Sequence, residues 1–431
     1  MLKLPFLKNK QHKEISPDFL TLTLDPHKIS VVYFQAPQIL DDSQDEIQKL
    51  SIPEFSALSF SNPDLQKIKV ICAKSKYFSN DQIFAPMEDF FSQTVDLLNQ
   101  ILDEIEFEYS QVPLKAIFGL SPRNCIDLMS IVRYSNSERA KIIEQQSQEL
   151  YAQAEKNATI RAQDLLASQK GDMDTDLVPI TSVEVSLKLD EETVRDPIGL
   201  EGQELELSWF GSFAESSYLN FLEKLAKKVG LEIIGVSSLG YAFYDTLQES
   251  PDNKNCVIID FNTSKTSVYV AFGGSLVGSR YMDIGVLSLI ADLSRRLSVH
   301  ADEAVEILRK YQQTTLSESL SMEVNKSLEK FSIVWLKALE SIFSDFSGVK
   351  TFSSKVFLTG AGFDILDFKD LVQKEPWFKS IPFKAPPEFV QASISEKILD
   401  ISGVSSSLEW VLPLSLGCLL YTSPSPRDRT R

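Results

Sequence analysis

The sequence has few cysteines, no long apolar run and no excess of basic residues. Its four cysteines, Cys72, Cys125, Cys256 and Cys418, are far apart and form no Cys-x-x-Cys pair, so neither a disulfide framework nor a zinc site is predicted, and a reducing compartment is favoured. No apolar run reaches the roughly 18 residues of a membrane span, and the basic start MLKLPFLKNKQHK lacks the apolar core of a signal peptide. We therefore expect a cytoplasmic chain, in solution or peripherally attached to a membrane.

The net charge and the length of the chain indicate which partners and how many domains to expect. The net charge of -17 argues against a nucleic-acid partner, because neutralising phosphates requires a basic face and no long Lys/Arg stripe is present. A chain of 431 residues with 43% hydrophobic content is long enough for two or three domains, each with its own core.

Strand and helix patterns alternate along the chain. Residues 19–35 predict a hairpin, and an amphipathic helix from Glu215 to Val229 precedes Gly230 as its C-terminal cap. The other predicted strands are near 67–78, 114–121, 182–189, 203–210, 231–238, 255–282 (three strands), 355–363 and 383, and the other helices are near 87–107, 137–170, 286–297, 301–311, 324–346 and 408–420.

A strand followed by a hairpin turn with an Asp occurs near the start of both halves of the chain. Asp25 lies in LTLDPHKISVVYF, and Asp260 lies in VIIDFNTSKTSVYV. A later strand, KVFLTGAGFDI, runs into a Gly-containing turn. This order of two hairpins and a third loop resembles the actin-like ATPases.

The resemblance implies that the two hairpin turns and the third loop hold ATP and Mg²⁺ between two domains. It implies metal ligation by Asp25 and Asp260, with backbone N–H groups on the phosphate oxygens. The nucleotide-binding residues that it implies are Asp25, His27, Asp260, Asn262, Thr263, Ser264, Lys265, Thr266, Thr359, Gly360, Ala361 and Gly362. The sequence leaves the ordinary alternatives open: a turn-capping Asp, solvated His27 and Lys265, and glycines that only turn the chain.

Within this superfamily, RDPIGLEGQELELSWF (Arg195 to Phe210) resembles a motif of the bacterial cell-division protein FtsA family, Asn-Pro-x-Gly-Met-x-Gly followed by an alternating strand. VGLEIIGVSSLGYAF and SRYMDIGVLSLIADLSRRLSVHADEAVEILRKY also resemble that family. The implied fold is α/β, a two-domain actin-like (RNase H-like) fold with an FtsA-type strand-helix-strand-strand insert. The expected divisions are a basic tail (1–14), the first domain (15–112 and 213–254), the insert (113–212), the second domain (255–297 and 353–420), its helical subdomain (298–352) and a tail resembling adaptor read-through (421–431).

The sequence also departs from the family. Pro26 and His27 follow Asp25 where the family has an apolar residue and Gly, so one N–H is absent and a ring occupies the closest approach to a phosphate. Asn262, Thr263 and Ser264 replace the glycines of the second loop. The sequence therefore predicts a weak ATPase at most, with binding retained more readily than hydrolysis.

The FtsA resemblance implies a scaffold that polymerises into filaments, binds the C-terminal tail of the tubulin-like FtsZ through residues 298–352, and lies on the inner face of the cell membrane at the division site. The alternatives are a scaffold similar to the pilus-assembly protein PilM, and an actin-fold kinase or ATPase. An enzyme needs an intact metal site and an open cleft for a second substrate, so the altered first loop argues against it.

Overall fold

The computed structural model describes residues 18–36, 67–78, 87–346 without 171–174, and 348–420. The predicted tails, 1–14 and 421–431, lie outside the described residues. Among the helices of the described residues, none is long and apolar enough to cross a membrane.

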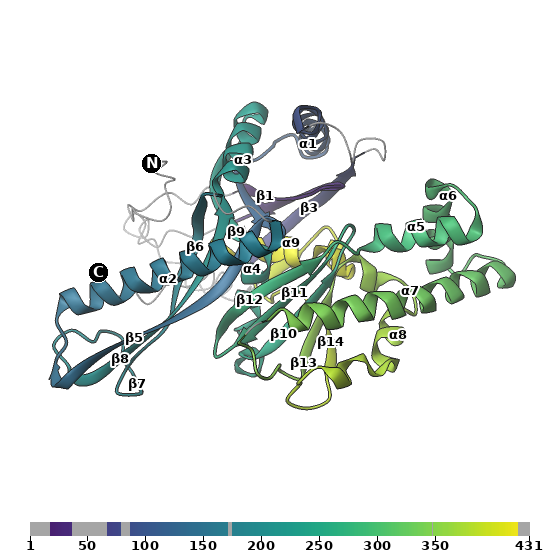
Figure 1. Ribbon diagram of the computed structural model, residues 1–431. Helices are drawn as coiled ribbons and strands as arrows, with labels where there is room; N and C mark the ends of the chain where they lie inside the picture. Colours follow the sequence, from purple (N-terminus) through teal and green to yellow (C-terminus); the bar gives the residue numbers. More distant parts are fainter. Residues whose placement is uncertain (1–17, 37–66, 79–86, 171–174, 347, 421–431) are drawn as a thin grey trace, which may run out of the picture.

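The first domain is built on a six-stranded sheet in the order β15-β3-β2-β1-β4-β9 (Figure 1). Antiparallel pairing joins β1, β2 and β3, whereas β4 and β9 continue the sheet in parallel with β1, and β15 pairs in parallel with β3. The central strand β2 is buried along almost its whole length because it is apolar on both faces. The bounds are β1 Asp18–Asp25, β2 Lys28–Gln35, β3 Ile68–Tyr77, β4 Lys115–Leu120, β9 Glu232–Ser238 and β15 Ile398–Asp400.

The second domain repeats this arrangement. Its strands lie in the order β12-β11-β10-β13-β14, with β10, β11 and β12 antiparallel and β13 and β14 parallel to β10. The order β3-β2-β1-β4-β9 in the first domain is the same, with the same strand directions. This duplication confirms the predicted two-domain actin-like α/β fold. The bounds are β10 Cys256–Phe261, β11 Thr266–Phe272, β12 Ser275–Met282, β13 Lys355–Thr359 and β14 Glu388–Gln391.

The insert extends the second sheet. Its elements follow as β5 (Cys125–Lys141), α2 (Glu144–Lys170), β6 (Leu177–Leu189), the two-residue β7 (Glu192–Thr193) and β8 (Glu201–Glu215). The long helix α2 lies along β5 and β8 (Figure 1). A single bridge between Gly278 of β12 and Leu128 of β5 joins the insert to the second-domain strands.

Two sequence-based assignments in this region were wrong. The strand predicted at 114–121 belongs to the first sheet as β4, and the first insert strand is β5, which the sequence analysis did not identify. Residues 137–141 continue this strand, so α2 begins at Glu144 rather than near Ser137. The outer half of β5 reads RYSNSERAK and is mostly exposed. It is a strand because it pairs with β8, a long-range contact that local patterning does not reveal.

The helices cover the two sheets and fill the space between them. Helix α1 (Met87–Tyr109) and α3 (Ser216–Val229) pack on the first sheet, and α3 ends at Gly230 with φ 78°, as predicted. Helix α4 (Leu239–Leu247) and α9 (Val411–Ser415) lie in the core shared by both domains. The remaining helices belong to the second domain: α5 Val286–Leu297, α6 Ala301–Gln312, α7 Glu318–Ser344 and α8 Phe368–Lys374.

Two predictions near the C-terminal end needed correction. Phe383 makes only an isolated bridge with Phe352, and the neighbouring strand is β14. The helix predicted over 408–420 is divided into a 3₁₀ turn η8 (Leu408–Trp410), α9 and a second 3₁₀ segment η9 (Leu416–Leu420). Pro413, within α9, has no N–H to donate to the preceding turn, which accounts for the irregular hydrogen bonding.

Candidate functional site

The two equivalent hairpin turns face each other across the boundary between the domains. The β1–β2 turn has two residues, Pro26 and His27, between the paired Asp25 and Lys28. The β10–β11 turn has four residues, from Asn262 to Lys265. The structure therefore brings the first predicted loop against the second, although 240 positions separate Asp25 from Lys265 in the sequence.

Asp25 joins the two turns directly. Its Oδ2 accepts a hydrogen bond of 2.6 Å from Ser264 Oγ and lies 3.1 Å from Lys265 Nζ. The Lys265 side chain is only 4% exposed and that of Asp25 is 19% exposed. Burial by itself raises the pKa of Asp25, but the Lys265 charge and the hydrogen bonds outweigh it and hold the pKa below its usual range. Asp25 is therefore an ionised partner of Lys265.

Asp25 also has the turn-capping role that is common for an Asp at the start of a turn. Its Oδ1 accepts a hydrogen bond of 3.1 Å from the backbone N–H of His27, which is a side chain-to-backbone turn typical of Asp. The imidazole of His27 is partly buried, and this burial lowers its pKa despite the neighbouring Asp25 charge. Both oxygens of Asp25 are thus occupied by groups of this chain.

Asp260 lies deeper than Asp25. It is buried in β10 beside Thr359 of β13, and burial raises its pKa to about 7, with Lys265 and Asn262 acting in the opposite direction. The third loop approaches closely from β13: a Cβ on Gly360 would lie 2.5 Å from Asp260 Oδ1, and Gly360 has φ 97°. Glycine is required there for both conformation and space.

The remaining predicted residues of the third loop and the second turn contact other parts of this protein. Thr359 Oγ1 donates to the carbonyl of Leu408 at 2.9 Å. Thr266 Oγ1 donates to the carbonyl of Ile284 at 2.7 Å and accepts from Trp335 Nε1 at 2.8 Å. Ala361 follows Gly360 at the start of a 3₁₀ turn.

Gly362 lies against the ring of Phe261 rather than against open space. A Cβ added at this position would come within 1.9 Å of that ring. The Phe261 ring is itself in contact with other aromatic side chains, which hold it in place. These are Phe331, Trp335, Phe363 and Phe368.

Helix α5 holds the second turn in position. The N–H groups of Val286 and Leu287 donate to the carbonyls of Asn262 and Thr263 at 3.0 and 2.9 Å. Gly285, which precedes the helix, lies so close to the turn that a Cβ would be 2.4 Å from the backbone nitrogen of Lys265. The sequence analysis did not select Gly285, although it stands in the SRYMDIG segment that carried the family resemblance.

The side chains at the two turns do not fit a magnesium–nucleotide complex. The two carboxylates that would hold the metal are occupied or buried, and the Lys265 ammonium, which lies 3.1 Å from Asp25 and whose charge also acts on Asp260, repels a cation. Across the described residues, no group of three or more His, Cys, Asp or Glu side chains is arranged to hold a metal ion. Pro26 also removes an N–H from the first turn. Of the two predicted metal ligands, Asp25 is therefore paired with Lys265, whereas Asp260 is buried in β10.

Two further polar contacts near this boundary escaped sequence reasoning. Lys28, at the end of the first turn, pairs with Glu409 of η8, 381 positions away. Asp127 of β5 is fully buried and accepts hydrogen bonds from Ser212 of β8 at 2.6 Å and from Ser238, the N-cap of α4, at 2.8 Å. Asp127 therefore connects the insert to the first domain. Neither contact has a local sequence signal.

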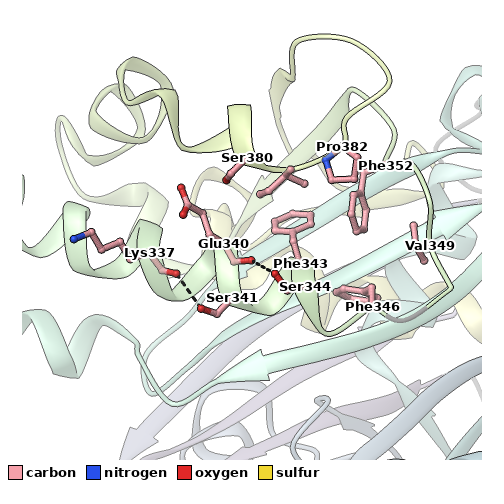
Figure 2. Close-up of a pocket in the computed structure, with 11 residues that line it drawn as sticks. Lys337, Glu340, Ser341, Phe343, Ser344, Phe346, Val349, Phe352, Ser380 and Pro382 are labelled. Carbon is pink, nitrogen blue, oxygen red and sulfur yellow. Dashed lines mark hydrogen bonds between the residues drawn. The ribbon is translucent and has the colours of Figure 1, made fainter.

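A hollow of about 420 Å³ lies away from the turns, at the C-terminal end of α7 (Figure 2). Phe343 and Phe352 face it, with Ser380 and Pro382 opposite the helix. Ser341 and Ser344 in its wall donate to carbonyls of their own helix. None of the residues predicted for nucleotide binding lines it.

Comparison with known proteins agrees with the topology. No protein-family model matches the chain. The cell division protein FtsA of Helicobacter pylori (strain ATCC 700392 / 26695) is 26% identical over 146 residues, which cover 34% of this chain and 30% of FtsA. The solved PilM-PilN type IV pilus biogenesis complex has a chain that superposes with a TM-score of 0.59 at 12% identity, covering 94% of this chain and 98% of that one. Over about a third of its length this chain is thus similar to FtsA, and its fold is actin-like.

The sequence matches cover only part of each relative. The match spans about 30% of the length of FtsA, and the PilM likeness shows the fold alone. An O-phosphoserine--tRNA(Cys) ligase of Methanococcus maripaludis (strain C5 / ATCC BAA-1333) is 31% identical over 149 residues but is covered for only 26% of its length. The two-domain topology described above is that of the actin-like fold that the FtsA resemblance predicted.

Proposed function

We propose that this protein is an FtsA-like assembly scaffold. In this proposal it associates with itself into filaments, binds the C-terminal tail of FtsZ and links it to the inner face of the cell membrane at the division site. The observation that carries the proposal is the strand-helix-strand-strand insert on a duplicated actin-like fold, together with sequence similarity to FtsA.

The geometry of the two turns favours a scaffold over an enzyme. Phosphoryl transfer needs a metal ion on the phosphates and a carboxylate placed against the attacking group. Asp25 is bound to Lys265 and Ser264, and Asp260 is buried with a pKa near 7. Mg-ATP binding, which the FtsA resemblance implies, does not fit the paired Asp25 and the buried Asp260, and the scaffold proposal does not depend on it.

A pilus-type scaffold is the second candidate, because the PilM chain of the PilM-PilN complex superposes over almost the whole of this chain. Both candidates are binding proteins of the same fold, so the partner decides between them. A peptide with the FtsZ tail sequence and a peptide from PilN are therefore the informative ligands.

The experiment is co-sedimentation of the full chain with each peptide fused to a large carrier, with a scrambled peptide as the control. We expect the FtsZ tail to bind and the PilN peptide not to bind.

The proposed contact surface is the helical subdomain, where Val305 of α6 and Met322 of α7 are 46% and 55% exposed. Val305→Asp and Met322→Asp should weaken binding, whereas Ile198→Asp, at a 48% exposed position in the insert, should not. Binding of the PilN peptide alone would replace the division role with the pilus role.

A further inference from the structure

The first hairpin turn is held at both of its ends by residues from the second half of the chain. Asp25 begins the turn and pairs with Lys265 at 3.1 Å. Lys28 ends the turn and pairs with Glu409. At its first end the turn contributes the negative charge, and at its second end it contributes the positive charge. A shift of one domain against the other would bring like charges together, so the two pairs favour one alignment of the domains.

Both lysines are unusually well buried. The Lys265 side chain is 4% exposed and the Lys28 side chain is 5% exposed. The Lys28 ammonium also lies 5.0 Å from the centre of the Trp410 ring and 5.6 Å from that of Tyr77, at distances typical of cation–π contacts. Because an unpaired buried charge is strongly unfavourable, separating the turns would require both lysines to find water or new partners.

The second turn is equally well fixed. Its carbonyls accept hydrogen bonds from the first N–H groups of α5, and Gly285 packs against its backbone. On the other side, Leu408, next to Glu409, accepts hydrogen bonds from Thr359 and Gly360 of the third loop. The partners of Asp25 and Lys28 are thus both attached to the second domain.

We propose that the ion pairs Asp25–Lys265 and Lys28–Glu409 form a built-in latch that closes the two domains without metal or nucleotide, with the Lys265 ammonium in the place of the cation. The latch is a property of these four side chains and does not depend on the identity of the scaffold's partner. It explains why the residues implied for Mg-ATP are present but paired with one another.

Hydrogen exchange on the full chain, stripped of nucleotide with EDTA, tests the latch. The amides to follow are those of Asp25, His27 and Lys28 and those of residues 262–266, because Pro26 has no N–H. We expect both turns to be protected in the wild type, with less than a twofold change on adding millimolar Mg-ATP. Lys265→Met should raise exchange in both turns at least tenfold. Asp25→Lys should do the same, and the double variant Asp25→Lys with Lys265→Asp should recover most of the protection.

The chain offers a control in Lys326 and Glu323 of α7, an ion pair of 2.7 Å whose side chains are 56% and 52% exposed. Because exposed pairs contribute little, Lys326→Ala should leave exchange in both turns unchanged. If Asp25→Lys does not fold, Ser264→Ala supplies a milder loss, with a smaller rise in both turns. Tenfold slower exchange in the wild type with Mg-ATP, or no change in Lys265→Met, would overturn the latch. Neither result bears on partner binding, which co-sedimentation measures separately.

Discussion

Asp260→Asn should stabilise this protein at neutral and alkaline pH and leave it unchanged near pH 4. The carboxyl is buried in β10, and burial raises its pKa from 3.8 to about 7. The folded protein therefore holds a proton that the unfolded chain releases. Asparagine has nearly the same shape as the protonated acid and does not ionise, so the substitution removes the free energy of burying the charge.

The sign and size of the effect follow from these pKa values. The pKa of Asp260 is higher in the folded protein than in the unfolded chain. Its contribution to the free energy of unfolding is therefore fully present below about pH 4 and is lost as the pH rises to about 7. Three pH units correspond to on the order of 4 kcal/mol. For 431 residues, the entropy of unfolding is roughly 0.9 kcal/mol per kelvin, so Tm should rise by about 4 °C above pH 7.

The assay is a thermal unfolding scan of the wild type and Asp260→Asn at half-unit steps from pH 3.5 to 8.5. The wild-type Tm should fall relative to the variant Tm between pH 4 and pH 7, because His27 and the other buried groups with shifted pKa values titrate equally in both proteins and only the wild type carries Asp260. Below about pH 4 both proteins should lose stability together, because the pKa of Asp25 is lowered in the folded state and the unfolded chain takes up the Asp25 proton first. A variant that is less stable than the wild type at pH 8, or that keeps the wild-type slope, would refute the reasoning.

The other predictions concern packing at the domain boundary. Gly362→Ala should destabilise by about 1–3 kcal/mol in urea unfolding, because its Cβ would meet the fixed Phe261 ring at 1.9 Å, whereas Gly235→Ala, with no atom nearer than 3.7 Å, should stay within about 1 kcal/mol. Asp127→Ala should cost roughly 2–4 kcal/mol, because it leaves two buried hydroxyls without their acceptor. Asp127→Asn, which keeps one acceptor, should cost less, and equal losses for the two variants would contradict this explanation.

The parts of the fold that local patterning specifies were predicted correctly. The two hairpins with Asp25 and Asp260, the helix ending at Gly230, and the three strands from Cys256 to Met282 follow from alternation, turn chemistry and capping. The resemblance predicted that the two turns face each other, but with a nucleotide between them. It did not predict the direct contact of Asp25 with Ser264 and Lys265.

The features that the sequence did not predict depend on contacts between residues far apart in the chain. The outer half of β5 is a strand only because β8 lies beside it. The partner of Lys28 is 381 positions away, and Asp127 is buried among serines contributed by two other elements. A single sequence does not show which distant charge will neutralise which, so the Asp25–Lys265 pair had no sequence signal although both residues were candidates.

Calorimetric titration of Mg-ATP into the full chain tests most directly whether its own charges hold the two domains together. The wild type should show no binding heat up to millimolar ATP, and Lys265→Met should behave the same way because a metal site is not restored by removing the lysine alone. Micromolar binding to the wild type that Asp260→Ala weakens would contradict the account and place a magnesium nucleotide between the two turns.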